Sequence, residues 1–278
     1  MAAFDIVVRW SYDDHTMSAV TANETVLFVH STGTGPMLWA SVRPEILGGR
    51  RAIAPPNVGY PPRPPVARGV QVTAEDDVTA VLEAVPGDAE RVHVVGHSYG
   101  ASLAMRVAER LAGRTRSLFV YEPVLFGALS RSTPEPAARE EAAFFSEHPW
   151  FMRDDARGGT EPWLEIFVDY WNRKGSWARM PEPMRAHSRA MGWKMYQEVR
   201  GCISDERTFE GWRLPASTTL CRGGRTTAAS RAMTEALAQA NPHAAVVVLE
   251  DLAHMAPLTS PEPVHAAIAA HLARGGAS

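Results

Sequence analysis

Short apolar runs alternate with longer helical stretches from residue 24 onward, and this alternation constrains the fold more than any other feature. Residues 73–85, 98–113, 226–240 and 261–275 have helical periodicity. Six intervening runs have the length and β-branched composition of buried strands: ETVLFVH (24–30), RRAIAPP (50–56), RVHVVGH (91–97), RSLFVYEP (116–123), STTLCR (217–222) and AAVVVLE (244–250). The pattern predicts a doubly wound, mostly parallel α/β sheet whose functional site lies beyond the carboxyl ends of the strands. An antiparallel hairpin expected from FDIVVRW (4–10) and MSAVTA (17–22) brings the sheet to eight strands.

The alternation is interrupted between residues 133 and 215. This stretch opens with STPEPAAREEAAFF, is helical in character and contains six of the eight tryptophans of the chain. We therefore expect an α/β core formed by residues 1–132 and 216–278, and a helical lid, residues 133–215, inserted into it. Most aromatic side chains of the lid are expected to form its own small core. Three of them are expected to contact substrate in an apolar pocket: Trp163, Trp171 and Trp193.

Composition narrows the classes of partner. The formal net charge is −3 and no long basic stripe is present, which argues against nucleic acid and anionic lipid. The chain starts without a secretory signal and contains no apolar run long enough to span a membrane, so we expect a cytoplasmic protein without a membrane partner. Cys202 and Cys221 lack metal-ligand spacing, and we expect neither metal nor cofactor. A small-molecule substrate is the expected partner, and a homodimer is left open.

The motif GHSYG, residues 96–100, directly follows one expected strand and opens the next helix. Gly-x-Ser-x-Gly alone is a weak signal, but at a strand-turn-helix junction it predicts a nucleophile elbow. Gly96 and Gly100 then permit the sharp turn that projects Ser98 over the sheet. The start of the helix also offers unpaired N–H groups and a positive dipole end to a developing oxyanion. A glycine-rich turn with an incidental serine is the alternative interpretation.

A serine nucleophile needs a base, and His254 is the strongest candidate among the ten histidines. It follows the last expected strand and precedes the last expected helix, which places it at the same sheet edge as Ser98. His30 also ends a strand, but it begins HSTGTGPMLW, a loop suited to donating backbone N–H groups.

Several segments together resemble the α/β-hydrolase fold superfamily, over nearly all of the chain outside the insertion: VLFVHSTGTGPMLW, VVGHSYGAS and LAHMAPLTSPEPVHAAI. The resemblance implies a cofactor-independent serine hydrolase with a helical lid and the chain order serine, acid, histidine. It also implies an oxyanion hole formed by the backbone N–H of Tyr99 and that of a residue in loop 30–34, for which we choose Thr32. The chain departs from the common His-Gly pair of the family at Ser31.

The loop that usually carries the acid of the family contains none. It follows STTLCR and reads CRGGRTTAAS, without aspartate or glutamate. In some members, including haloalkane dehalogenases, the acid follows the preceding strand instead, and the resemblance then assigns it to Glu122 in LFVYEPVLF. Asp251 and Glu250, shortly before His254, and Asp205 in the lid are rival acids. The structural alternative is that Glu122 only accepts backbone N–H bonds or closes the lid hinge.

These residues predict carboxylesterase-like chemistry on an ester or lactone of a small, partly apolar substrate. Ser98 attacks the carbonyl with His254 as base, and an acyl-enzyme is hydrolysed by water that the same histidine activates. Because the usual acid is absent, two alternatives stay open. One is a receptor-like protein that binds a hydrophobic small molecule with weak or no turnover. The other is a non-hydrolytic member that uses Ser98 and His254 for acid/base or acyl-transfer chemistry.

Overall fold

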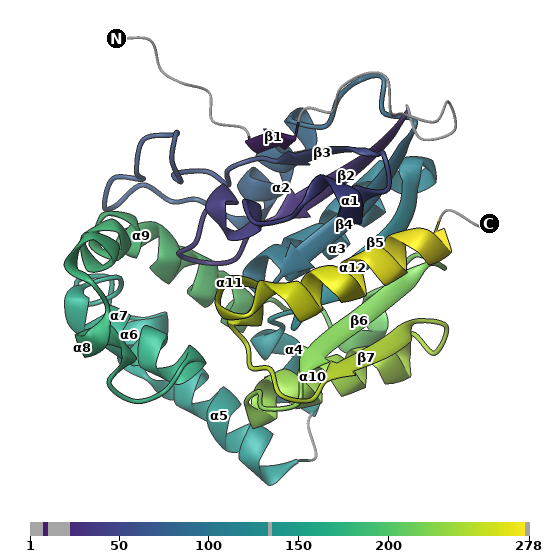
Figure 1. The fold of residues 1–278 in the computed structure, drawn as a ribbon. Helices are drawn as coiled ribbons and strands as arrows, with labels where there is room; N and C mark the ends of the chain where they lie inside the picture. The colour runs from purple at the N-terminus through teal and green to yellow at the C-terminus, as the bar shows by residue number, and fades with distance from the viewer. Residues whose placement is uncertain (1–7, 11–22, 133–134, 276–278) are drawn as a thin grey trace, which may run out of the picture.

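A seven-stranded sheet forms the centre of the computed structural model, which describes residues 8–10, 23–132 and 135–275 (Figure 1). Its order is β1-β3-β2-β4-β5-β6-β7, with β1 antiparallel to β3 and the other neighbours parallel. The strands are β1 Val8–Trp10, β2 Glu24–Val29, β3 Arg51–Ala54, β4 Arg91–His97, β5 Thr115–Tyr121, β6 Thr218–Gly223 and β7 Ala245–Leu249. The predicted doubly wound, mostly parallel architecture is confirmed. The predicted second arm of the hairpin, residues 17–22, lies outside the described residues, so the eighth strand stays a prediction.

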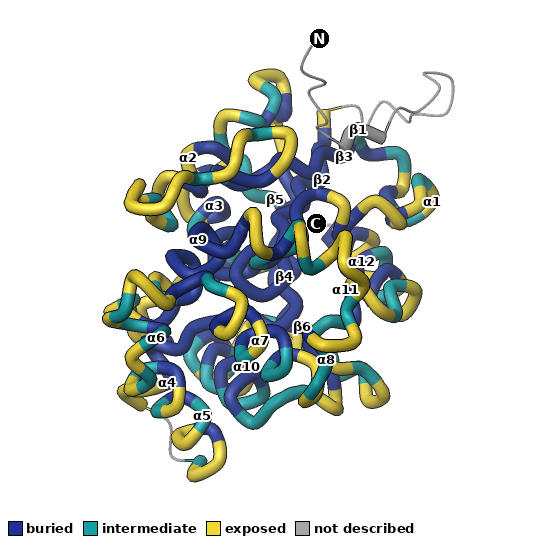
Figure 2. Tube along the Cα trace, turned by 90° about the vertical axis from the view of Figure 1, so that its left-hand side faces the viewer, coloured by how far each residue is buried: buried dark blue, intermediate teal, exposed yellow. Residues whose placement is uncertain are grey.

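Successive residues of the central strands enter two hydrophobic layers on opposite faces of the sheet. In β2, Leu27 and Val29 belong to one layer, whereas Val26 and Phe28 belong to the other. The first layer includes residues of α2 Ala74–Glu83, α3 Tyr99–Leu111 and α10 Ala228–Ala240, and the second includes residues of α1 Pro44–Leu47 and α12 Pro261–Gly275. Figure 2 shows the resulting gradient, with buried strands inside and exposed turns of helix outside. The four helices expected from periodicity are thus confirmed.

The remaining helices include a continuous group between β5 and β6. Those in the group are α4 Phe126–Ser132, α5 Pro136–Glu147, α6 Pro149–Met152, α7 Glu161–Trp171, α8 Ser176–Arg179 and α9 Glu182–Ser204. Among the described residues, a short 3₁₀ helix at Phe209–Gly211 follows this group before β6. Helix α11 Ala256–Thr259 and two more 3₁₀ helices, Pro36–Trp39 and Ala112–Arg114, lie elsewhere in the described chain. The helical run begins at Phe126, earlier than the predicted lid boundary, and its buried aromatic residues join the same layer as α3. A separate lid domain over 133–215 stays a prediction.

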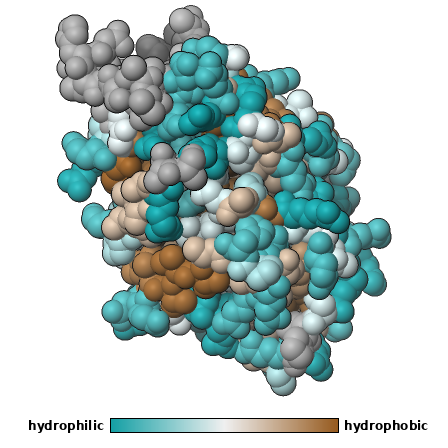
Figure 3. Space-filling model, turned by 90° about the vertical axis from the view of Figure 1, so that its right-hand side faces the viewer, coloured by the Kyte–Doolittle hydropathy of each residue, from teal (hydrophilic) through white to brown (hydrophobic). Residues whose placement is uncertain are grey.

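Strand β7 is an edge of the described sheet and is apolar along its length. Val246 is exposed, and Val247 and Val248 are half-buried. Figure 3, which views the molecule from the right-hand side of Figure 1, shows one hydrophobic patch on an otherwise largely hydrophilic face. A homodimer stays a prediction.

Among the helices that the structure describes, none has the length and apolarity needed to cross a lipid bilayer.

Candidate active site

The segment GHSYG forms a sharp turn between β4 and α3. Ser98 adopts φ 58° and ψ −123°, a left-handed conformation that is strained for a residue with a side chain. Close backbone contacts require glycine on either side. A Cβ on Gly96 would lie 2.5 Å from the carbonyl oxygen of Gly100, and one on Gly100 would lie 2.3 Å from that of His30. The turn therefore fixes the Ser98 side chain at the carboxyl end of β4.

The structure brings together the three residues predicted to be catalytic. The Ser98 Oγ is 2.9 Å from His254 Nε2, and His254 Nδ1 is 2.7 Å from Glu122 Oε2. All three residues are buried. Two of the rival acids pair with arginines instead, Asp251 with Arg225 and Asp205 with Arg106, and His254 Nδ1 contacts Glu122 rather than Glu250.

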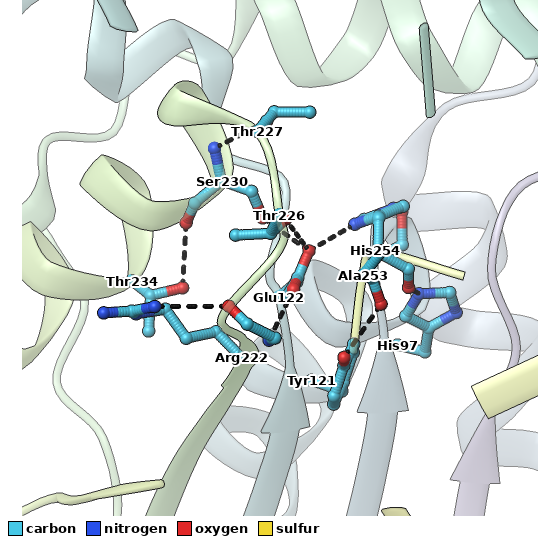
Figure 4. A network of polar contacts seen from close by, with 12 residues as sticks. His97, Tyr121, Glu122, Arg222, Thr226, Thr227, Ser230, Thr234, Ala253 and His254 are labelled. Carbon is cyan, nitrogen blue, oxygen red and sulfur yellow. Dashed lines mark hydrogen bonds and ion pairs between the residues drawn. The ribbon is translucent and has the colours of Figure 1, made fainter. Parts of the chain in front are cut away.

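Glu122 accepts hydrogen bonds from the connection that lacks an acid (Figure 4). Its Oε1 accepts from the Gly223 N–H at 2.8 Å, and its Oε2 accepts from the hydroxyls of Thr226 at 2.6 Å and Ser230 at 2.7 Å. Burial by itself raises the pKa of Glu122, but the bonds from His254, Thr226 and Gly223 outweigh it and hold the pKa below its ordinary value. Sequence reasoning missed Thr226 and Ser230, although the hydroxyl-rich run TTAAS was the available signal.

Three further side chains hold His254 in place. The His97 Nε2–H donates to the backbone oxygen of His254 at 2.8 Å, and the Tyr121 hydroxyl donates to that of Ala253 at 2.9 Å (Figure 4). Burial lowers the pKa of His97 to about 3, so this imidazole is neutral. Trp171 stacks on the His254 ring, with centroids 3.8 Å apart and planes at 24°. The imidazole is thus fixed at its backbone and covered on one face.

A cavity of about 490 Å³ opens above Ser98 and His254. Its walls come from the loop after β2, from α7 and α9, and from the segment around α11. The lining residues that the structure describes include no aspartate, glutamate, lysine or arginine. Part of the rim is apolar and exposed: Met37, Met184 and Leu258. Five methionines line the cavity: Met37, Met180, Met184, Met195 and Met255. Because methionine side chains are unbranched and adaptable, the lining suits uncharged, apolar groups of varied shape.

A second cavity, of about 20 Å³, lies behind Ser98. It shares Thr32, Ser98, Phe167 and Trp171 with the large cavity, but His254 does not line it. Its remaining lining residues are Tyr99, Val124, Phe126, Phe145, Val199 and Cys202.

Of the three tryptophans predicted to contact substrate, the structure brings only Trp171 to these cavities. Trp163 is fully buried and stacks on Phe167, with ring centroids 5.2 Å apart. The Trp193 Nε1–H donates to the Val70 backbone oxygen at 2.8 Å, and neither residue lines a cavity at Ser98. The expectation for Trp163 and Trp193 is corrected accordingly, because a tryptophan-rich segment does not reveal which helix face is turned toward a site.

The two residues predicted to form the oxyanion hole both lie beside Ser98, at the small cavity. Tyr99 is the first residue of α3, where a backbone N–H has no partner within the helix. The neighbours of Thr32 use their own N–H groups, because that of Gly33 donates to the Tyr60 hydroxyl at 2.8 Å and that of Thr34 to the Ser31 carbonyl at 3.3 Å. No cluster of three potential metal ligands occurs in the part of the chain that the structure describes.

Comparison with known proteins places this geometry in a family. The profile described as "Alpha/beta hydrolase family" matches residues 26–267. The chain is 36% identical over 121 residues to a 2-hydroxy-6-oxo-2,4-heptadienoate hydrolase of Pseudomonas putida, a match that covers 41% of this chain and 40% of the relative. It is 33% identical over 114 residues to a 2-hydroxymuconate semialdehyde hydrolase of Pseudomonas sp. strain CF600, covering 39% of this chain and 38% of the relative. These matches span about two fifths of the curated relatives.

Solved structures share the fold over most of the chain. A thermophilic esterase from Thermogutta terrifontis superposes with a TM-score of 0.64 at 20% identity, covering 92% of this chain and 91% of the other. The enol-lactonase from Burkholderia xenovorans LB400 superposes with a TM-score of 0.62 at 15% identity, covering 92% and 94%. The family profile spans most of β2, the strands β3 to β7, the elbow and the histidine loop. This chain belongs to the alpha/beta hydrolase family.

Proposed function

We propose that the protein is a serine hydrolase that cleaves an uncharged ester or lactone through an acyl-enzyme on Ser98. One observation carries the proposal, namely the hydrogen-bonded series Ser98, His254, Glu122 at the floor of an apolar cavity. A hydroxyl, an imidazole and an ionised carboxylate in this order form the arrangement that activates a serine for attack on a carbonyl.

The geometry gives each group one task. His254 Nε2 accepts the hydroxyl proton as Ser98 Oγ bonds to the carbonyl carbon, and Glu122 keeps the remaining proton on Nδ1. The oxyanion is stabilised by the backbone N–H groups of Thr32 and Tyr99. His254 then protonates the leaving oxygen as its bond to carbon breaks. Water, deprotonated by His254, attacks the acyl carbon, and Ser98 leaves with the proton, which releases the carboxylic acid.

The lining of the large cavity favours an uncharged substrate. The names of the two Pseudomonas relatives specify an oxo-dienoate and a muconate semialdehyde, both carboxylate-bearing compounds. Among the described residues of this chain, no arginine or lysine lines the cavity. Arg222 and Arg225, which stand near the connection after β6, instead pair with Glu235 and Asp251. A buried carboxylate without a cationic partner is costly, so we assign a neutral ester or lactone.

A fluorophosphonate probe followed by mass spectrometry tests the proposal. We expect one adduct, on Ser98, and we expect Ser98→Ala to lose both labelling and ester hydrolysis. Ser102→Ala is the matched control, because Ser102 lies one turn further along α3 and donates to the Val124 carbonyl rather than to a histidine. A wild-type protein that stays unlabelled and hydrolyses no ester in a panel of chain lengths would favour the receptor-like alternative.

A further inference from the structure

The two cavities that meet at Ser98 differ in size and in their relation to His254. The large one, about 490 Å³, is lined by Ser98 and His254, whereas the small one, about 20 Å³, is lined by Ser98 but not by His254. Thr32 borders both. A carbonyl carbon attacked by Ser98 therefore has one substituent on the histidine side and one on the opposite side.

Proton transfer decides which part of an ester occupies which cavity. The leaving oxygen must receive its proton from His254 Nε2, so the alcohol portion lies on the histidine side, in the large cavity. The acyl portion then extends into the small cavity, which Thr32 and Tyr99 also line, so this space of about 20 Å³ must take the carbonyl oxygen as well and leaves room for no more than a hydrogen or methyl substituent. We infer that the substrate is an ester of a very short acid, formic or acetic, with a larger, uncharged and apolar alcohol. This inference rests on the proposed function and favours an open ester over a lactone, whose acyl and alcohol portions are joined.

The walls of the small cavity resist enlargement. Phe126, Phe145 and Trp171 are almost fully buried, and Phe126 contacts the other two at ring centroid distances of 4.8 and 6.1 Å. A longer acyl chain would have to displace these packed rings, which costs more than rotating the methionines that line the large cavity.

Two isomeric esters test this assignment, because one carries its six-carbon chain on the alcohol side of the ester group and the other carries it on the acyl side. Hexyl acetate is expected to have a kcat/KM at least about tenfold above that of ethyl hexanoate, since each misfitted methylene costs a factor of about ten or more. The distally charged analogue 6-acetoxyhexanoate is expected to be at least about tenfold poorer than hexyl acetate. Equal rates for the two isomers, or faster cleavage of ethyl hexanoate, would overturn the assignment. Fluorophosphonate labelling of Ser98 in the same preparation shows whether the proposed function fails as well.

Two valine variants test whether the small cavity, rather than the large one, sets the preference for acyl-chain length. Val199 lines only the small cavity and Val168 only the large one. Val199→Ala is expected to raise the kcat/KM ratio of hexyl propanoate to hexyl acetate at least about tenfold, whereas Val168→Ala leaves that ratio within about twofold. Equal responses of the ratio to the two variants would contradict the acyl assignment.

A buried charged cluster of Lys194, Asp77 and Glu198 connects α9 to the proposed oxyanion residues. The Lys194 ammonium, 1% exposed, lies 2.8 Å from Asp77 Oδ2 and 2.5 Å from Glu198 Oε1. Burial by itself lowers the pKa of Lys194, but the two carboxyl groups outweigh it and raise the pKa above its ordinary value, so the amine stays charged.

The cluster reaches both proposed oxyanion donors through side-chain hydroxyls. The Tyr99 hydroxyl donates to Asp77 Oδ2 at 2.6 Å, and the Thr32 side chain is near enough to Glu198 to act on the pKa of that carboxyl, lowering it against the effect of burial. Tyr60 adds a third link, because its hydroxyl donates to Glu198 Oε2 at 2.9 Å and accepts from the N–H beside Thr32, that of Gly33.

We propose that Lys194, Asp77 and Glu198 are positioning residues that set the two backbone N–H donors at Ser98. Oxyanion stabilisation depends on donors held at a fixed distance from the developing charge, and both donor residues are tied to the same ion-pair cluster. Moving α9 away would separate buried opposite charges, which is strongly unfavourable. Helix α9 is therefore a fixed wall of the active site, and substrate enters without its displacement. This inference also rests on the proposed function.

Removing single hydroxyls tests the cluster. Lys194→Met leaves two carboxyl groups buried without their cation and endangers folding, so Tyr60→Phe and Tyr99→Phe are used instead. Each is expected to lower kcat for hexyl acetate about tenfold, less than deletion of an oxyanion donor, with KM within about twofold. Tyr196→Phe is the control, because its hydroxyl also donates to a carboxylate, Asp155 at 2.8 Å, but outside the cluster.

The three variants also separate positioning from stability. Tyr60→Phe and Tyr196→Phe each lose one donated and one accepted hydrogen bond, and Tyr99→Phe loses one donated bond, so a lower Tm is expected for all three. A kcat loss in the two cluster variants but not in Tyr196→Phe supports positioning. An unchanged kcat in the cluster variants, or an equal loss in Tyr196→Phe, overturns it, while retained phosphonylation of Ser98 shows that the proposed function still holds.

Discussion

Glu122→Gln is expected to lower the rate of Ser98 acylation at least about 10²-fold while the fold stays intact. The glutamine is nearly isosteric and can still accept from the Gly223 N–H, but it removes the negative charge 2.7 Å from His254 Nδ1. The imidazolium that forms during attack then lacks its counter-charge, and an amide N–H facing Nδ1 favours the wrong tautomer. The burst rate with p-nitrophenyl acetate measures acylation directly.

Glu141→Gln is the matched control for this prediction. Glu141 is also a glutamate beside the start of α10, accepting from the N–H groups of Ala228 and Ala229, yet it does not contact His254. Its acylation rate is expected to stay within about twofold of the parent, because no charge next to the imidazole changes. If Glu122→Gln were as active as Glu141→Gln, Glu122 would not be the residue that orients His254.

The connection after β6 shows how far sequence reasoning reached. The absence of an acid in CRGGRTTAAS directed attention to Glu122, and the structure places that carboxylate at His254. The same connection supplies hydrogen-bond donors from Gly223, Thr226 and Ser230, which sequence reasoning did not anticipate. A hydroxyl-rich turn has many uses, and only the strand order, with β6 beside β5, shows that these groups converge on one carboxylate.

Strand and helix positions were predictable because their signals are local, whereas the faces of the helices between β5 and β6 were not. Periodicity indicates which side of a helix is apolar, but side chains on several different faces of α9 make specific contacts. Trp193 faces the loop before α2, Met195 the large cavity, and Lys194 the carboxylates of Asp77 and Glu198. From the sequence alone, Lys194, between Trp193 and Met195, would be expected to be exposed to solvent. Its burial depends on a partner 117 positions away in the chain.

Acidification from about pH 7 to pH 5 is expected to lower the free energy of unfolding by several kcal/mol. Burial lowers the pKa of His30, His97 and His271 from 6.5 to about 3, and that of His93 to about 4. Between these values and 6.5 the unfolded chain binds protons that the folded protein does not, so the folded state loses stability as the pH falls. At pH 5 the loss is about 2 kcal/mol for each histidine, or 1.36 kcal/mol for each pH unit below 6.5.

Urea unfolding at about pH 7, 6 and 5 measures this dependence, and a variant away from the active site assigns it. His271 bonds to the hydroxyls of Thr219 and Ser117, and His271→Asn is expected to remove about 2 kcal/mol of the acid-induced loss. Glu122 also makes the folded state less stable as the pH falls. Because its folded-state pKa is lowered, its contribution to the free energy of unfolding is lost only below its ordinary pKa of 4.5. A flat profile from pH 7 to pH 5, with loss of stability only below about pH 4.5, would therefore assign the acid sensitivity to carboxylates and contradict neutral, buried imidazoles in the folded protein.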